Sequence, residues 1–521
     1  MIEEVSAGAL RAALDNGDYT VRDLVQACLD RIAAMDKVGP ALHAVIETNP
    51  DALTIADSLD AELRDGRSRG PLHGIPVLLK DNIGTADQMQ TTAGSLALEG
   101  AIPHQDAFIA ARLRDAGAVI LGKANLSEWA NIRSAHSSSG WSARGGQALN
   151  PYQLDRTTSG SSSGSGAAVA ASYAPLAIGT ETNGSICSPA GTCGIVGIKP
   201  TIGLVSRSGI IPISQLQDTA GPMTRSVADA AMLLNVLAAD DPNDPAQESE
   251  ERSALYPARP DGGLPRIDYT SALVADGLRG ARIGVWREPL QGSTAASDVF
   301  ARALDALREA GAELVDPVAF PSAEAMKRGP ETLHVMLWRL KADIANYLES
   351  CIDAAFPIRD LADIVAFNRD HASEELPWFG QDLLEMALET GAADDPGSLA
   401  MVETVQRWGR EEGIDAVLQE HRLDAIVAPA NAPATRIDLV NGDHRLGGSS
   451  TPSAIAGYPI VTVPVGFFAG LPVGINFMGT AYSEETLIRL AYGFEQATQA
   501  RRAPTYAAPG VLPPGEPGLA D

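Results

Sequence analysis

A lysine at the end of an apolar segment is the first residue in this chain that could do chemistry. Lys80 follows residues 74–79, GIPVLL, and precedes Asp81 and Asn82. A lysine that enters a hydrophobic core costs free energy unless it is neutral or well bonded, so burial lowers its pKa. A neutral amine is a competent general base for a serine hydroxyl. The alternative is structural, because a lysine at a strand end can also extend its amine to the surface.

A run of serines and glycines, SGSSSGSG at residues 159–166, is the second candidate. A flexible linker is disfavoured because a helix-compatible segment and then an apolar strand follow at once. The run matches neither glycine-rich phosphate-binding pattern, and no lysine follows it. Residues 160–164 do match G-x-S-x-G, which would make Ser162 the nucleophile of a Ser-His-Asp hydrolase. That interpretation needs a strand directly before the run, whereas residues 150–158, NPYQLDRTT, are polar and turn-like.

A third candidate is the segment 179–186, GTETNGSI. An apolar strand runs here into a tight turn that contains Gly184 and presents Ser185 at its end. The backbone N–H groups of such a turn can form a nest that binds an oxyanion. Because a strand, a turn and a serine also occur together by chance, this pattern gains weight only beside the other two.

The elements that must position these residues predict an α/β fold. Nearly continuous runs of Ile, Val and Leu are typical of strands buried on both faces of a sheet. Helices with one apolar stripe alternate with them, as in residues 21–35, where Thr20 is the expected N-cap. We therefore expect helices on both faces of a large buried sheet. The predicted strands are 43–47, 75–80, 119–123, 176–182, 194–199, 282–286, 424–428, 460–465 and 473–478, and the further helices are 106–117, 226–239, 298–310 and 484–500.

Two segments break this alternation. Residues 240–266 are rich in Asp, Glu, Pro and Gly, which predicts a surface excursion. Residues 323–422 look mainly helical and contain few strand signals. Their aromatic residues are more typical of helix packing than of a pocket; they are Trp338, Tyr347, Phe356, Phe367, Trp378, Phe379 and Trp408.

Composition excludes several classes of function. The 521 residues carry 39 Lys and Arg against 66 Asp and Glu, a formal net charge of −27. Nucleic acids and anionic membranes bind basic surfaces, so neither is expected as a partner. No apolar run approaches the roughly 20 residues of a membrane span, and the first ten residues do not resemble a secretory signal. The 4 cysteines form neither a CxxC pair nor a metal site, so we expect a cytoplasmic protein with reduced thiols.

Together, Lys80, the serine run and the turn at Ser185 resemble the amidase signature family, whose catalytic unit is Ser-cisSer-Lys. The resemblance covers most of the chain. It implies an α/β/α sandwich with a mixed central sheet, formed by residues 1–521 as one domain, with a catalytic core at about 70–235 and a helical excursion at about 323–422. The motifs, in chain order, are GPLHGIPVLLKDN (70–82), GKANLSEW (122–129), residues 160–171, residues 179–185, GIVGIKPT (194–201), Gly221-Pro222, SVAD (226–229) and GLPVGI (470–475).

The resemblance also implies a role for each candidate residue. Ser185 corresponds to the nucleophile, Ser161, which is 185 − 161 = 24 positions earlier, to the bridging serine, and Lys80 to the base. Ser162 is then only a neighbour of the bridging serine, and the peptide bond between Gly160 and Ser161 is expected to be cis. The implied oxyanion hole consists of the backbone N–H groups of Thr182, Asn183, Gly184 and Ser185. Of these residues, Asn183 departs from the family's usual Gly-Gly-Ser sequence.

Within the family, the sequence most resembles bacterial peptide amidases, through residues 139–146, 203–214 and 217–222. This resemblance implies hydrolysis of peptide C-terminal amides, with no metal, no cofactor and no obligate protein partner. Hydrolysis of aryl or alkyl amides is the alternative, and the A subunit of a tRNA-dependent amidotransferase is a third interpretation. We expect the substrate pocket to draw on residues 131–141, 207–217 and parts of 323–422, with substrate contacts from Asn131, Trp141 and Gln217.

Overall fold

The centre of the computed structural model, which describes residues 1–248, 267–290, 293–326, 329–444 and 446–510, is a mixed sheet of 11 strands. Their order is β1-β3-β2-β6-β8-β7-β12-β13-β11-β9-β10. Strands β3, β2 and β6 are parallel, as are β11, β9 and β10, and the pairs between these two groups are antiparallel. The strands of the sheet are β1 (Val45–Thr48), β2 (Pro76–Lys80), β3 (Val119–Ala124), β6 (Leu176–Glu181), β7 (Val196–Lys199), β8 (Thr219–Thr224), β9 (Arg282–Val285), β10 (Glu313–Val315), β11 (Ala425–Pro429), β12 (Ile460–Phe468) and β13 (Leu471–Met478).

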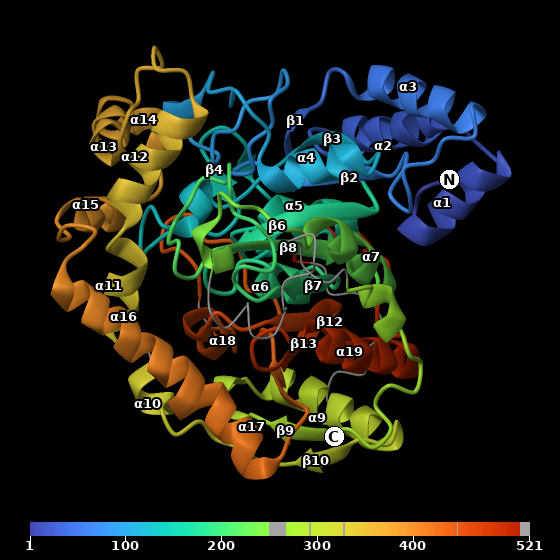
Figure 1. Cartoon of the computed structure of the whole chain (residues 1–521), viewed down its shortest axis with the longest axis vertical. Coiled ribbons are helices and arrows are strands. Elements are labelled where there is room, and N and C mark those ends of the chain that lie inside the picture. Colours follow the sequence, from blue (N-terminus) through green and yellow to red (C-terminus); the bar gives the residue numbers. More distant parts are fainter. Residues whose placement is uncertain (249–266, 291–292, 327–328, 445, 511–521) are drawn as a thin grey trace.

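Helices from along the whole chain surround this sheet (Figure 1). The mixed α/β fold expected from the sequence is confirmed. Thr20 caps α2 as predicted, and its side chain forms a capping box with Asp23. The helices are α1 (Ala7–Asn16), α2 (Val21–Met35), α3 (Ala52–Arg64), α4 (Phe108–Asp115), α5 (Ser163–Ala170), α6 (Cys187–Thr192), α7 (Val227–Leu237), α9 (Thr294–Glu309), α10 (Ala323–Met326), α11 (Pro330–Leu337), α12 (Leu340–Cys351), α13 (Leu361–Asp370), α14 (Ala372–Glu375), α15 (Asp382–Leu388), α16 (Pro396–Gly409), α17 (Asp415–His421), α18 (Thr451–Ala456) and α19 (Glu484–Thr498).

Strand β8 is the main element that the hydrophobic pattern does not predict. It contains Gly221 and Pro222, which are unusual inside a strand. The glycine is required by close packing, because a Cβ at Gly221 would lie 2.0 Å from the carbonyl oxygen of Ile198. β8 pairs with β6 over six residue pairs, so it supports the strand that leads to Ser185.

The predicted helical excursion is confirmed as the series α10 to α17, which runs down one side of the molecule in yellow and orange (Figure 1). It packs on the rest of the chain through a shared apolar cluster. Leu340 and Ile344 of α12 belong to the same buried cluster as Leu126 and Trp129 of the segment after β3. This contact brings α12 toward the region of Lys80 and Ser161.

Three further sequence expectations concern the segment 240–266, the cysteines and the absence of a membrane span. Of the excursion predicted at 240–266, residues 249–266 lie outside the described part of the chain. All 4 cysteines are buried free thiols. None of the helices in the described ranges combines the length and the apolar character that crossing a bilayer requires.

A short hairpin outside the large sheet completes the strand inventory. β4 (Trp141–Ser142) and β5 (Gly146–Gln147) pair antiparallel. This hairpin belongs to the loop that follows β3, and Ser142 Oγ donates a hydrogen bond of 2.8 Å to the side-chain oxygen of Asn125. The hairpin therefore fixes the loop between β3 and the serine run.

Candidate active site

Lys80 is the last residue of β2, and its side chain is completely buried. Its Nζ lies 2.8 Å from Ser161 Oγ, 2.8 Å from Thr180 Oγ1 and 3.2 Å from the Thr180 carbonyl oxygen. β2 and β6 are parallel neighbours, which is why Lys80 and Thr180 end at the same edge of the sheet. The alternative in which Lys80 extends to the surface is therefore wrong.

Burial changes the protonation of this lysine. Loss of solvation lowers the pKa of Lys80 to about 7, while the negative charges of Asp218 and Glu181 oppose that decrease. Its three hydrogen-bond partners are neutral oxygen atoms, none of which fixes a proton on the amine as a carboxylate would. A substantial fraction of the amine is consequently neutral near pH 7 and able to accept a proton.

The serine run places Ser161 against this amine. The Gly160–Ser161 peptide bond is cis, as expected from the family resemblance. The packing favours glycine at residue 160, because a Cβ there would lie 2.2 Å from Ser127 Oγ. The carbonyl of Ser161 accepts the N–H of Ser127 at 3.0 Å, and Ser161 itself is fully buried.

Ser162 has a different role from the one that the G-x-S-x-G match would give it. Its Oγ lies 3.0 Å from the carbonyl oxygen of Thr180 and accepts the N–H of Thr180 at 3.2 Å. These two bonds fasten the start of α5 to β6, so the Ser162 hydroxyl is occupied by the backbone of the sheet. Ser161, rather than Ser162, contacts Lys80.

Ser185 lies in the turn between β6 and α6. Gly184 has a φ of 87°, which favours glycine, and a Cβ there would lie 2.9 Å from Ser450 Oγ. The N–H of Ser162 donates to the carbonyl of Ser185 at 3.1 Å, which ties this turn to the serine run. Ser185 is 9% exposed, in contrast to Lys80 and Ser161 at 0%, so it is the residue of the three that solvent or a ligand reaches.

Two side chains stabilise the turn from either side. Glu181 Oε2 accepts the N–H groups of Ile186 at 2.7 Å and Cys187 at 2.9 Å. The side chain of Asn183 points toward the start of α18, where it accepts a hydrogen bond from Ser450 Oγ at 2.7 Å. The departure from Gly-Gly-Ser is thus accommodated, because the added side chain is held away from Ser185 by a bond of its own.

Asp218 connects this turn to the wall of a cavity. Its Oδ1 accepts the hydroxyl of Thr182 at 2.5 Å, and its Oδ2 accepts the N–H groups of Ile213 at 2.7 Å and Ser214 at 2.8 Å. Burial raises the pKa of Asp218 to about 6, against the lowering effect of these hydrogen bonds. Asp218 is therefore mostly ionised at pH 7 and close enough to Lys80 to influence its proton.

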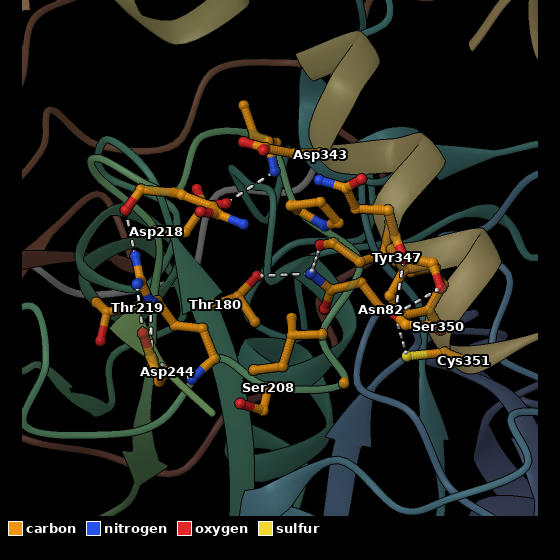
Figure 2. Close-up of a pocket in the computed structure, with 18 of the residues that line it drawn as sticks. Asn82, Thr180, Ser208, Asp218, Thr219, Asp244, Asp343, Tyr347, Ser350 and Cys351 are labelled. Atoms are coloured by element: carbon orange, nitrogen blue, oxygen red, sulfur yellow. Dashed lines mark hydrogen bonds and ion pairs between the residues drawn. The ribbon is translucent and has the colours of Figure 1, made fainter. Parts of the chain in front are cut away.

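The cavity beside these residues has a volume of about 460 Å³. Thr180, Thr182 and Asp218 contribute the wall nearest Lys80, and residues 207–213 and 215 contribute another. Asp343, Tyr347, Ser350 and Cys351 of α12 lie on the far side (Figure 2), and Asn346 of the same helix also lines the cavity. The segments 207–217 and 323–422 were both expected to supply the pocket, and both line this cavity.

The three residues that the sequence suggested as substrate contacts do not line this cavity. Asn131 accepts a hydrogen bond from Ser137 at 2.7 Å, Trp141 packs edge-on against Phe379 with 5.3 Å between ring centroids, and Gln217 is 3% exposed. None of the three is among the described residues that line the cavity, although their neighbours Ala130 and Asp218 are.

The site contains no constellation that would hold a metal. Across the described ranges, no three side chains of His, Cys, Asp or Glu gather closely enough to ligate an ion. The polar atoms at the site are hydroxyls, one amine, backbone amides and the carboxylates of Glu181 and Asp218, which hold the turn through hydrogen bonds. This set is suited to proton transfer and to binding an anion rather than to coordinating a cation.

The comparison with known proteins identifies the family of this site. Residues 23–488 match the family model described as Amidase. The chain belongs to the amidase family. As a member of it, this protein is an amide-hydrolysing enzyme.

Individual relatives cover nearly all of this amidase. A probable amidase from Arabidopsis thaliana is 39% identical over 513 residues, which is 97% of this chain and 92% of the relative. A putative amidase from Arthroderma benhamiae is 40% identical over 512 residues, 94% of this chain and 81% of the relative. The structure of the native peptide amidase from Stenotrophomonas maltophilia superposes with a TM-score of 0.90 at 50% identity, covering 97% of this chain and 99% of that one. The resemblance to the amidase signature family and to peptide amidases is confirmed.

Sequence reasoning missed three residues of the amidase site that the geometry adds. Thr180 contacts Lys80 directly, Asn82 donates to Thr180 Oγ1 at 3.1 Å, and Asp218 holds Thr182. All three lie inside stretches that the sequence singled out, which are residues 70–82, 179–186 and 217–222, but none was given a role. Membership of a motif was the available signal, but it does not reveal which side chain turns toward the site.

Proposed function

We propose that this amidase hydrolyses the C-terminal amides of peptides, with Ser185 as nucleophile, Ser161 as proton relay and Lys80 as base. The observation that carries the proposal is the fully buried amine of Lys80 at 2.8 Å from Ser161 Oγ, with its pKa lowered to about 7 by burial. Enzymes that need a general base at neutral pH tune its pKa toward that range. The likeness to a peptide amidase at 50% identity supports the choice of substrate.

The reaction begins with transfer of two protons. Neutral Lys80 accepts the hydroxyl proton of Ser161, which accepts that of Ser185 while Ser185 Oγ bonds to the amide carbon. The proton then returns through Ser161 to the substrate nitrogen, so the C–N bond breaks with ammonia as the leaving group rather than an amide anion. Water finally attacks the acyl ester on Ser185 and releases the carboxylic acid.

The turn before α6 would stabilise the charge that develops on the carbonyl oxygen. Backbone N–H groups of Thr182, Asn183, Gly184 and Ser185 are the proposed donors. Removing one donor of such an oxyanion hole costs about 3 kcal/mol of transition-state stabilisation. Asp218 and Glu181 hold the two ends of this turn, at Thr182 and at Ile186, so the donors are preorganised before substrate binds.

A substrate panel tests the proposal directly. The purified chain, without added metal, cofactor or partner protein, is given a dipeptide amide, an anilide, a short aliphatic amide and glutamine. We expect ammonia release from the dipeptide amide with a kcat/KM at least about tenfold above that for the other substrates, because a dipeptide amide can make more contacts in a cavity of about 460 Å³ than a short amide can. A preference for the anilide would instead make the protein an acylamidase, and activity on glutamine alone would favour the amidotransferase interpretation.

The pH dependence of kcat/KM offers a second test. Activity should rise with pH through about 7, because Lys80 must lose a proton before it can act as the base. Asp218→Asn removes a negative charge that raises the pKa of Lys80, so this rise should move to lower pH. An asparagine can keep the geometry, with its oxygen accepting from Ile213 and Ser214 and its amide donating to Thr182. A rise that moves to higher pH in Asp218→Asn would contradict the assigned base.

A further inference from the structure

A second cavity, with a volume of about 380 Å³, adjoins the cavity of about 460 Å³ beside Lys80. Arg207, Gln215 and Pro245 line both cavities, so the two share part of a wall. Concave sites with apolar walls and a few polar groups are typical of binding sites for small molecules. The apolar and aromatic walls of the second cavity include Ile202, Leu216, Trp338, Val402, Tyr458 and Tyr482.

The two cavities carry opposite charge. Arg207, Arg339 and Arg410 line the second cavity, and no Asp or Glu is among the described residues that line it. The cavity beside Lys80 is lined by three aspartates and one arginine, a sum of 1 − 3 = −2. Three cations around one cavity are unexpected in a chain with a net charge of −27. A concave surface lined by one sign of charge attracts ligands of the opposite sign.

Two ion pairs produce this separation of charge. Arg207 binds Asp244, with Nε at 3.0 Å from Oδ2, and Arg339 binds Asp343, with Nη2 at 3.1 Å from Oδ1. Both aspartates line the cavity beside Lys80 and not the second cavity, whereas both arginines line the second cavity. The aspartates offset part of the arginine charge, but they do so from outside the second cavity.

Arg339 keeps hydrogen-bond donors that a ligand can use. Its Nε and Nη1 have no partner in the part of the chain that the structure describes. Neither atom is fully buried, and the side chain is 26% exposed. Arg339 lines the second cavity and not the cavity beside Lys80, and its guanidinium carbon lies 5.9 Å from the centroid of the Trp338 ring. Charged donors and an aromatic wall therefore lie side by side.

We propose that the second cavity binds a carboxylate that carries an apolar group, with Arg339 as its main polar contact. A guanidinium has donors and no acceptor, and an ionised carboxylate has acceptors and no donor. Arg410, whose guanidinium carbon lies 5.7 Å from the centroid of the Tyr458 ring, adds positive charge, and the apolar walls match the rest of such a ligand. Amide hydrolysis releases a carboxylic acid, so a product of this enzyme belongs to the same chemical class.

Titration calorimetry tests the inference with probes that differ in the carboxylate. The probes are N-acetylphenylalanine and N-acetylphenylalaninol, in which a neutral alcohol replaces the acid. We expect the wild-type Kd for the acid to be at least about tenfold lower, the size of one charge-assisted hydrogen bond. Equal Kd values for the two probes would overturn the inference, and so would inorganic phosphate that binds as tightly as the acid, because the site would then select charge alone.

A third probe distinguishes two sources of the ligand. 3-Phenylpropanoate has the carboxylate and the ring of N-acetylphenylalanine but no peptide group. Weaker binding of 3-phenylpropanoate would support a site for acylated amino acids, the class that peptide amide hydrolysis releases. Equal binding of the two acids would support a site for apolar carboxylates in general.

Three variants separate the charge of Arg339 from its structural role. Arg339→Gln should raise the Kd of the acid about tenfold. Asp343→Asn breaks the same ion pair but keeps the guanidinium, so the Kd should stay unchanged or fall. Arg407→Gln is the control for lost surface charge, because Arg407 of α16 binds Glu412 and does not line the cavity, and it should leave the Kd unchanged. An equal increase in Arg339→Gln and Asp343→Asn, or none in Arg339→Gln, would overturn the inference.

A matched pair of bulky substitutions locates the ligand. Leu399 is exposed and lines only the second of the two cavities, whereas Asn346 is exposed and lines only the cavity beside Lys80. Leu399→Trp should raise the Kd of the acid by obstructing the second cavity, and Asn346→Trp should not change it. The reverse result would place the acid beside Lys80 and overturn the inference. These titrations need no turnover, so their outcome is independent of the proposed nucleophile and of the peptide substrate.

Discussion

Ser185→Ala should lower kcat for ammonia release from a peptide amide by roughly 10⁴- to 10⁶-fold, the range found when a serine hydrolase loses its nucleophile. The reason is that no other hydroxyl can replace it. Ser161 Oγ is buried against Lys80, and Ser162 Oγ is bonded to the backbone of Thr180. The change removes one oxygen atom from a residue at 9% exposure, so the fold should tolerate it.

A matched control comes from the same serine run. Ser165 is buried in α5, and its Oγ donates to the carbonyl of Ile178 at 3.1 Å. Ser165→Ala should retain kcat within about tenfold and lose only about 1 kcal/mol of stability, the value of one buried hydrogen bond. A serine-reactive phosphonate supplies an independent readout, because it should label wild type at Ser185 and leave Ser185→Ala unlabelled. Labelling at Ser162, or more than about one hundredth of wild-type activity in Ser185→Ala, would contradict the assignment of the nucleophile.

Most strands of this fold could be predicted because central strands carry their signal locally. Segments such as residues 75–80 and 460–465 are nearly continuous apolar runs, and both form strands of the large sheet. β8 was not predicted from the sequence, because glycine and proline, here Gly221 and Pro222, are in general disfavoured in strands. That glycine is explained only by the carbonyl of Ile198, which lies on the neighbouring strand. The exception therefore depends on a tertiary contact that no local pattern contains.

The residues of the site also fall into two groups: those that a sequence motif marks and those that only the folded structure brings to the site. The family motifs made Lys80, Ser161 and Ser185 the candidates, and the motif spacing favoured Ser161 over Ser162. Asp218 lies inside the stretch 217–222 but was given no role, and Asp343 lies in no motif. They are 218 − 80 = 138 and 343 − 80 = 263 positions from the lysine, and they reach the cavity through the pairing of β8 with β6 and the packing of α12. An aspartate in a loop or on a helix is ordinarily a solvated residue, so its burial at a cavity wall is information that only the assembled fold provides.

Lys80→Ala should lower kcat for the same substrate by at least about 10³- to 10⁴-fold. General base catalysis alone supplies about 10²- to 10⁴-fold, and residues that act as a unit lose more than their individual shares. Lys80→Met is a useful companion, because methionine fills nearly the same space without an amine. In either variant the residual rate should no longer rise through pH 7, since the group whose pKa is about 7 has been removed. Near-full activity across the pH range would show that Lys80 is not the base.

A second buried lysine makes this test specific. Lys123 is the penultimate residue of β3 and pairs with Leu79, the residue before Lys80. It is completely buried, and burial lowers its pKa to about 8. Its Nζ is bonded to the carbonyl of Ile83 at 2.6 Å and to Thr91 Oγ1 at 2.8 Å, neither of which contacts Ser161. Lys123→Met should therefore reduce the free energy of unfolding, which chemical denaturation measures, while the folded enzyme keeps the pH-dependent rise through 7. If Lys123→Met instead removed that rise and Lys80→Met retained it, the proton acceptor would be Lys123. The comparison is informative because both amines are buried and have different hydrogen-bond partners.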